Sequence, residues 1–103
     1  MNVYIIICNY PNNITAEKTA INIIKLKMSH CVTILKNIQS IYMYKNKIYK
    51  EKEFSIIIKT EAKSLKKLIK KIITTHPYKN PEIVTLKILK NENRTNRETN
   101  NID

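Results

Sequence analysis

The stretch from Cys31 to Thr60 constrains the fold of this chain more than any other. Its two halves, CVTILKNIQSIYMY and KIYKEKEFSIIIKT, meet at Lys45-Asn46, and apolar residues recur at every second position, with gaps, along parts of both. Alternation with a period of two is typical of β-strands, and asparagine accepts the positive φ of a tight turn better than most residues with a Cβ. The pattern predicts two long antiparallel strands. The residues expected to share one side of the first strand are Val32, Ile34, Ile38, Tyr42 and Tyr44.

The length of these strands predicts an oligomer. Each strand would have about 13 residues and extend roughly 43 Å, at about 3.3 Å per residue. A chain of 103 residues is expected to form one domain, with a radius of gyration of about 13 Å. Strands of that length extend beyond their own domain, so we expect the tip of the hairpin to pack on another copy of the chain.

The remaining segments predict two helices and two further strands. The run VYIIIC, which ends at Cys8, is continuously apolar, as in a strand buried on both faces, and residues 9–13 have the composition of a turn. A helix is expected over residues 15–28, with Asn13 or Thr15 as its N-cap. A second helix is expected over residues 61–75, because apolar residues recur there at helical spacing opposite a row of lysines. The last predicted strand covers residues 82–89.

The order strand, helix, strand, strand, helix, strand is that of a ferredoxin-like α+β sandwich, βαββαβ. It predicts a four-stranded antiparallel sheet with two helices on one face and a long central hairpin. We expect this domain to span residues 1–89. A polar and flexible tail is expected over residues 90–103, where one residue in fourteen is apolar. The topology is expected to bring Cys8, Tyr44 and His76 to the same end of the sheet.

The composition excludes several classes of function. The chain has no glycine, and its one aspartate is Asp103, so phosphate-binding loops, dinucleotide-binding motifs and Ser-His-Asp triads are not expected. We therefore expect a protein that is not an enzyme. The net charge of +11 is compatible with polyanion binding. However, the lysines of the second helix are predicted to lie opposite the open face of the sheet, so no specific nucleic-acid binding is expected.

The cysteine content and the hydropathy indicate the compartment. Two cysteines, Cys8 and Cys31, do not make a disulfide framework, and Cys31 is expected to be a core residue. No secretion signal is recognisable, and no run approaches the roughly 20 apolar residues of a membrane span. We expect a soluble, cytoplasmic protein with no membrane association.

Several short motifs, in this order and spacing, resemble the CutA family of divalent-cation tolerance proteins. The similarity covers about residues 3–89. The resemblance implies a ferredoxin-like fold, a homotrimer joined edge to edge by the long strands, and a role in metal tolerance with copper binding. The motifs are Cys31-Val32-Thr33 at the entry to the hairpin, Ser40-Ile41-Tyr42 before its turn, Ile58-Lys59-Thr60 before the second helix, and His76-Pro77-Tyr78 followed by Pro81-Glu82-Ile83.

Three features depart from the family pattern. Tyr44-Lys45-Asn46 occupies the hairpin tip, where members of the family usually have Trp-x-Gly. Thr75 precedes His76 in the place of a second histidine, which weakens a metal site. The polar tail replaces an apolar C-terminal segment, which weakens the expected trimer.

Cys8 and His76 correspond to the metal ligands that the resemblance implies, so copper or another divalent cation is the expected cofactor. Thiolate and imidazole suit copper and zinc, but a closed zinc site needs four ligands. A third ligand would come from water, Tyr78 or a neighbouring subunit. The alternative is structural: Cys8 ends a buried strand as a small apolar residue, and His76 packs in its loop. The sequence leaves both interpretations open.

A second hypothesis for the function is a signalling or scaffold trimer, similar in architecture to the PII proteins. Such a trimer would bind a small anionic ligand or a protein partner in clefts between its subunits. The hypothesis is motivated by Glu51, Glu53 and Lys59, which lie on the second strand of the hairpin near the expected subunit contact. The simpler interpretation is that these are ordinary interface charges.

Overall fold

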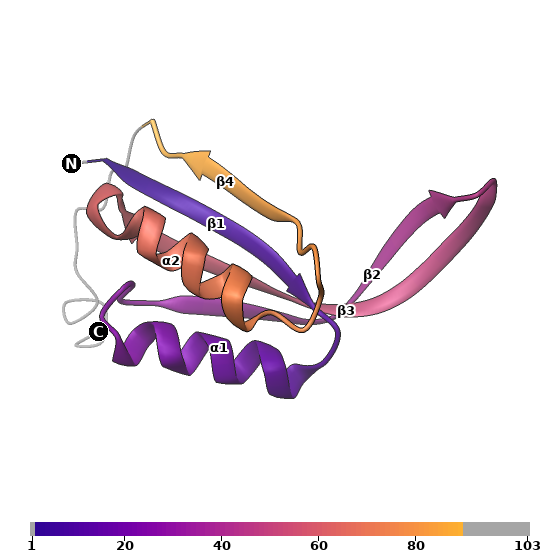
Figure 1. Ribbon diagram of the computed structural model, residues 1–103, viewed down its shortest axis with the longest axis horizontal. Coiled ribbons are helices and arrows are strands. Elements are labelled where there is room, and N and C mark those ends of the chain that lie inside the picture. Colours follow the sequence, from indigo (N-terminus) through magenta and orange to yellow (C-terminus); the bar gives the residue numbers. More distant parts are fainter. Residues whose placement is uncertain (1, 90–103) are drawn as a thin grey trace, which may run out of the picture.

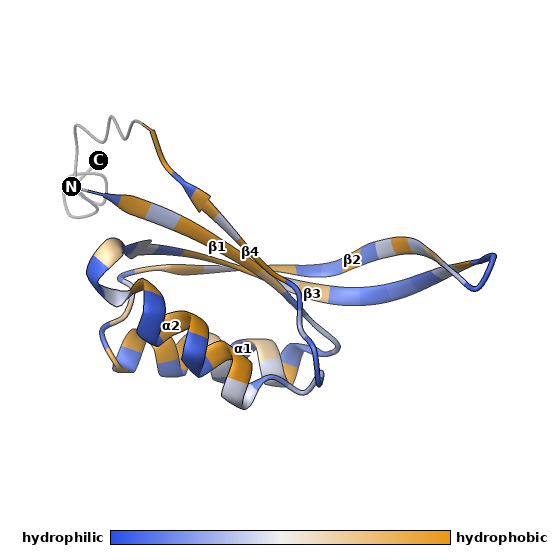
Figure 2. Ribbon diagram, turned by 45° about the horizontal axis from the view of Figure 1, so that its top comes forward, coloured by the Kyte–Doolittle hydropathy of each residue, from blue (hydrophilic) through white to orange (hydrophobic). Residues whose placement is uncertain are grey.

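The computed structural model describes residues 2–89, so the tail predicted for residues 90–103 lies outside the described part (Figure 1). The strands form one antiparallel sheet in the order β2-β3-β1-β4, and both helices cover the same face of it (Figure 2). The predicted ferredoxin-like α+β fold is confirmed. Its elements are β1 (Val3–Tyr10), α1 (Asn13–Lys25), β2 (Val32–Tyr44), β3 (Lys47–Glu61), α2 (Ala62–Thr75) and β4 (Ile83–Lys87).

The core lies between the helices and the two central strands, β1 and β3. Side chains alternate across a strand, and the even-numbered residues of both strands face the helices. Ile6, Ile56 and Ile58 are fully buried there, against Leu68 and other apolar residues of the two helices. Each buried isoleucine stabilises the fold by about 1.5–3 kcal/mol relative to an exposed one. No helix within residues 2–89 is both long and apolar enough to span a membrane.

Strand β1 is longer than the sequence predicts. Asn9 and Tyr10 were expected to begin a turn, but both pair with β3, opposite Ser55 and Phe54. The side chain of Tyr10 is fully buried beneath the helices, and this tertiary burial overrides the turn preference of the asparagine. The last strand, β4, is shorter than predicted, because it begins and ends inside the predicted range of 82–89.

Helix α1 begins and ends earlier than predicted. Its N-cap is Asn12 rather than Asn13 or Thr15, and the Oδ1 atom of Asn12 accepts a hydrogen bond from the Thr15 N–H at 2.8 Å. At the other end Lys27 adopts a φ of 58°, and its N–H donates to the Ile24 carbonyl at 3.0 Å. A left-handed residue at this position ends a helix, and here a lysine fills it because the chain has no glycine.

The predicted hairpin turn is confirmed, but a β-bulge interrupts the first strand. Lys45 and Asn46 have φ values of 50° and 63°, as in a two-residue type I′ turn. In the register of the two strands, Leu35 lies opposite Ser55 whereas Ile38 lies opposite Glu53. One extra residue is therefore present on β2. Asn37, with a φ of 56°, supplies the left-handed conformation that such a bulge needs.

The bulge changes which residues of β2 share a side. An extra residue shifts the alternation by one, so side chains after it point to the opposite face. Val32 and Ile34 face the helices, whereas Ile38, Tyr42 and Tyr44 pair with odd-numbered residues of β3 and lie on the other side. The prediction that all five share one side was therefore wrong.

Beyond the bulge the hairpin leaves the body of the molecule, as Figure 1 shows. We call this part the outer hairpin (residues 38–53). The molecule measures 49 Å along its longest axis and 30 and 28 Å along the others. Tyr44 pairs with Lys47 at the tip, whereas the end of β1 pairs with Phe54. These positions are roughly 23 Å apart at about 3.3 Å per residue, so the expected convergence of Tyr44 with Cys8 and His76 was wrong.

Candidate functional site

Cys8 and His76 come together at the end of β1. Both approach the same atom, the backbone carbonyl oxygen of Asn9. The Cys8 S–H donates to this oxygen at 3.9 Å, and the Nε2 atom of His76 lies 2.8 Å from it. The two side chains come from elements far apart in the sequence, since Cys8 lies in β1 and His76 caps the C-terminus of α2.

The hydrogen bonds of His76 fix its tautomer. The Asn9 carbonyl only accepts, so Nε2 must carry the ring proton and donate to it. Nδ1 accepts the backbone N–H of Tyr78 at 2.9 Å, so it carries no proton. Burial lowers the pKa of His76, which favours the same neutral form. Neither ring nitrogen therefore has a lone pair available without the loss of a hydrogen bond.

Cys8 is held as a neutral thiol. Its side chain is 1% exposed. Burial raises the pKa of the thiol to about 11, and the negative charge of Glu53 adds to the increase, against a smaller opposing effect of the Tyr10 hydroxyl. A thiol with this pKa is protonated at neutral pH, whereas the thiolate is the form that binds metals and reacts.

Tyr10 supplies the one polar atom of this region without a satisfied partner. Its ring stacks on that of His76, with centroids 4.2 Å apart. The hydroxyl lies near Cys8 and Thr19, yet within the described residues it makes no hydrogen bond of ordinary geometry. Burial raises the pKa of Tyr10 to about 12, so the phenol stays protonated.

The residues of one chain do not form a closed metal site here. Within residues 2–89, no three side chains of the types His, Cys, Asp and Glu lie together in a way that could hold a metal ion. Cys8 and His76 give two ligand atoms, and each is engaged in a hydrogen bond. Cys31, the other cysteine, is exposed rather than in the core, and it begins the hairpin at the opposite end of the sheet from Cys8.

A second cluster, which the sequence analysis did not identify, surrounds Glu53. Its carboxylate is 8% exposed. Oε1 accepts hydrogen bonds from the Ser40 hydroxyl at 2.6 Å and the Asn9 amide at 3.3 Å. Oε2 accepts from the Tyr78 hydroxyl at 2.8 Å. All three partners are neutral donors, so within the described residues Glu53 is a buried acid with no ion-pair partner.

The Glu53 cluster fixes the base of the outer hairpin. It joins β1, β2, β3 and the loop after α2 at one place. Burial and the Glu53 carboxylate both raise the pKa of Tyr78, so its hydroxyl remains a donor. Further along the same side, the Tyr42 hydroxyl donates to Glu51 at 2.6 Å, and the ring of Tyr42 stacks on that of Tyr49. The arrangement orients the hairpin relative to the body.

Asn9 connects this cluster with the Cys8 and His76 pair. Its carbonyl accepts from His76, and its side-chain amide donates to Glu53. The contacts between Glu53 and its partners on β1 and on the loop after α2 join residues 44 and 25 positions apart. Two sequence features could have pointed to this cluster, an acid next to an apolar strand segment and a tyrosine two residues after His76. Neither feature indicates which distant residue its side chain contacts.

Comparison with known proteins shows one consistent similarity. The sequence profile of the CutA1 divalent ion tolerance protein family matches residues 4–96. The divalent-cation tolerance protein CutA of Yersinia pestis (strain Pestoides F) is 28% identical over 87 residues, which are 84% of this chain and 73% of that protein.

Solved structures agree with the sequence comparison. The crystal structure of CutA1 from Oryza sativa superposes with a TM-score of 0.83 at 28% identity, and the match covers 89% of this chain and 84% of that one. CutA1 from Ehrlichia chaffeensis gives a TM-score of 0.82 at 26% identity, with 95% and 88% covered. The similarity therefore extends to the hairpin as well as the body.

Proposed function

Because this chain belongs to the CutA1 divalent ion tolerance protein family, we propose that it acts in divalent-cation tolerance as a homotrimer assembled through the β2–β3 hairpin. The proposal includes the binding of copper or another divalent cation, a cytoplasmic location and no enzymatic reaction. It treats residues 1–89 as the functional domain. The observation that carries the assembly is the uncovered apolar surface of the outer hairpin.

Large apolar side chains of the outer hairpin have no cover within the described chain. Met43 and Ile48 pair directly across the two strands and are 67% and 64% exposed, and Ile41 on the same side is 60% exposed. Apolar patches of this kind mark interfaces, and an isolated two-stranded hairpin is marginally stable in water. A neighbouring copy that packs on these side chains would bury the apolar surface and stabilise the hairpin.

The assembly has a direct test. Light scattering of the purified chain at micromolar concentration is expected to give three times the 12.1 kDa of one chain. A particle with the mass of one chain would contradict the proposed assembly.

Cation binding at Cys8 and His76 requires changes in the local hydrogen bonds. Cys8 has to lose a proton that burial holds, and His76 has to give up the contact with Asn9 or with Tyr78. The remaining ligands have to come from water or from a neighbouring copy. We therefore propose weak binding of the cation as cargo, with a preference for soft Cu(I) that the thiol provides.

Titration calorimetry with Cu(I), Cu(II) and Zn(II) tests this part of the proposal. Binding is expected to weaken in Cys8→Ser and in His76→Ala. Cys31→Ser is the matched control, because Cys31 is exposed at the far end of the sheet, and it is expected to bind like the wild type. Identical isotherms for the wild type and both site variants would remove Cys8 and His76 as ligands.

Thermal-shift measurements separate this proposal from the alternative of a trimer that binds a small anion. Glu53 and Glu51 give the base of the outer hairpin an acidic character, with hydrogen-bond donors already turned towards these carboxylates. These two carboxylates repel an anion at the base of the outer hairpin, whereas Lys59, which motivated the alternative, lies further along β3. We expect copper to raise the melting temperature and nucleotides or small metabolites to leave it unchanged, whereas the reverse pattern would favour the alternative.

A further inference from the structure

The outer side of α1 carries a second apolar stripe, distinct from the one that packs on the sheet. Ala16, Ala20 and Ile23 are buried on the inner side. Ile14 and Ile21 are 78% and 50% exposed. Positions i and i+7 lie on the same side of a helix two turns apart, so the two exposed isoleucines form one stripe. Apolar and polar segments alternate along α1 in Figure 2.

These isoleucines line an open hollow along the outer side of α1. The hollow has a volume of about 490 Å³, and it is also lined by Lys18, Lys25 and Glu17, all of them residues of α1. We call Ile14, Lys18, Ile21 and Lys25 the α1 outer surface. Pockets that hold small molecules bury most of the ligand. A hollow that is open along one helix instead suits an extended element, such as the side chains of a second helix.

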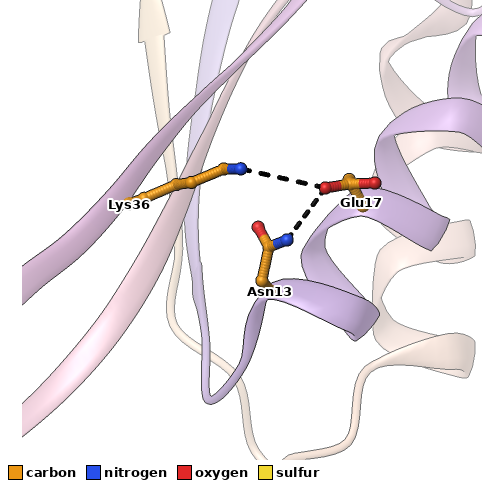
Figure 3. Close-up of polar contacts among 3 residues, drawn as sticks. All are labelled: Asn13, Glu17 and Lys36. Atoms are coloured by element: carbon orange, nitrogen blue, oxygen red, sulfur yellow. Dashed lines mark hydrogen bonds and ion pairs between the residues drawn. The ribbon is translucent and has the colours of Figure 1, made fainter.

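The α1 outer surface has an unbalanced positive charge. Glu17 is the one acidic residue of α1. It is held by the Asn13 amide at 2.8 Å and lies 4.0 Å from the Lys36 ammonium of β2, as Figure 3 shows. This is the only ion pair within residues 2–89. Lys18 and Lys25 are therefore left without an ion-pair partner in the described part of the chain.

We propose that the α1 outer surface docks an acidic amphipathic helix of a protein partner. Apolar side chains of such a helix, at spacings of three, four and seven residues, would pack against Ile14 and Ile21. Acidic residues beside them would pair with Lys18 and Lys25, and this charge complementarity selects the partner. The surface lies on the helix layer, so it is separate from both the outer hairpin and the Cys8 and His76 pair.

Charge and composition disfavour the other occupants. A second copy of this chain carries a net charge of +11 and would place its own lysines against these. The chain's residues 90–103 have three basic and three acidic side chains and one apolar residue, Ile102, so they provide neither the charge nor the anchors. Nucleic acids need positive charge for phosphate contacts but gain nothing from two exposed isoleucines.

Fluorescence anisotropy with the full-length chain tests the proposal. The probe is a labelled peptide of about 18 residues, or five helical turns, with leucines at helical spacing and glutamates elsewhere. A peptide of the same composition with a scrambled order is the first control. The variants are Lys18→Glu/Lys25→Glu and Ile14→Ser/Ile21→Ser. The matched control is Lys66→Glu/Lys70→Glu, which makes the same change of charge at exposed positions of α2.

We expect the amphipathic peptide to bind to the wild type. The scrambled peptide should bind to the wild type roughly tenfold or more weakly, and each α1 variant should bind the amphipathic peptide more weakly by a similar factor. The reason is that the apolar anchors and the charge pairs act together. The α2 control is expected to change binding less than about threefold, since charges beyond about 8 Å are screened. Circular dichroism checks that every variant is folded.

Three results would overturn the proposal. The first is equal binding of the scrambled peptide, or of an oligothymidylate of the same charge. The second is an equal loss of binding in the α2 control. Both would show attraction to polyanions in general. The third is the absence of binding at millimolar peptide.

Discussion

The inner and outer parts of the β2–β3 hairpin have similar apolar residues, but the two parts differ in how far the rest of the chain buries these side chains. Ile56 and Ile58 of β3 are fully buried beneath the helices, whereas Ile41 and Ile48 beyond the bulge are 60% and 64% exposed. The same strand pair therefore changes from core to surface within one element. The difference shows that this chain buries the apolar residues of one part of its hairpin and leaves those of the other part exposed. Under the proposed assembly, stability and assembly should therefore respond to different substitutions.

The largest effect on stability is expected in the inner part. Ile58→Ala removes buried methyl groups and leaves a cavity, so it should lower the free energy of unfolding by about 2–5 kcal/mol. Guanidinium unfolding at a fixed protein concentration measures the loss. The matched substitution Ile48→Ala at the outer part should have less than half of this effect. Equal losses at the two positions would mean that the two parts do not differ as described.

The elements of the body were predictable because their signals are local. The helical spacing that ends at Thr75 marked α2, and Lys45-Asn46 marked the turn, since each pattern is contained within a short stretch of sequence. The bulge at Asn37 was not predictable in this way. A single extra residue in a strand of 13 leaves the apolar alternation visible, but it moves every later side chain to the other face.

The candidate site was predictable in part. Cys8 and His76 were placed together from the topology, and the structure brings them to one carbonyl oxygen. Their hydrogen bonds, the buried phenol of Tyr10 and the partners of Glu53 depend on contacts between distant segments, which no local pattern specifies. The predicted position of Tyr44 was wrong because the topology indicates at which end of the sheet a residue lies. It does not indicate how far the hairpin extends beyond that end.

A second effect, smaller than the core cavity, is expected at the boundary between the two parts. Glu53→Ala would leave the donors of Asn9, Ser40 and Tyr78 without their acceptor. Unpaired buried donors are costly, so we expect a loss of roughly 2–3 kcal/mol in the free energy of unfolding. Glu51→Ala is the control, because Glu51 is exposed and should change stability by about 0.5 kcal/mol or less. An equally small effect of both would show that the Glu53 cluster does not fix the hairpin.

The pH dependence of stability tests the burial of Cys8, the β1 residue that pairs with Ile56 in the inner part of the hairpin. Burial raises the pKa of Cys8 from its ordinary value of 9.0 to about 11. The unfolded chain therefore loses this proton first, and the stability that is complete below pH 9 is lost as the pH rises towards 11. The loss from this residue should be roughly 2 kcal/mol.

Urea unfolding between pH 8 and pH 11 measures this dependence. Cys8→Ser should show a flatter profile than the wild type, and Cys31→Ser, at an exposed position, should show the wild-type slope. If both variants keep the wild-type slope, Cys8 is not the group responsible.

The smallest effect is expected at the turn of the outer part. Asn46 has a φ of 63°, which glycine adopts without steric cost. Asn46→Gly should stabilise the hairpin by about 0.5 kcal/mol or less, because asparagine already tolerates this conformation. Thermal unfolding checks the sign, with Asn46→Val as the opposite control. A stabilising valine would contradict the type I′ turn.

Sedimentation velocity of the wild type and of Met43→Glu/Ile48→Glu tests the central claim, that the outer hairpin is the contact between copies of this chain. Both residues are exposed, so the substitutions should leave the helical circular dichroism of the body unchanged. Lys66→Glu/Lys70→Glu, at exposed positions of α2 outside the hairpin, is the control. We predict a trimer for the wild type and the control, and a folded monomer for the double variant. A double variant that sediments as a trimer, or a wild type that sediments as a monomer at micromolar concentration, would contradict the claim.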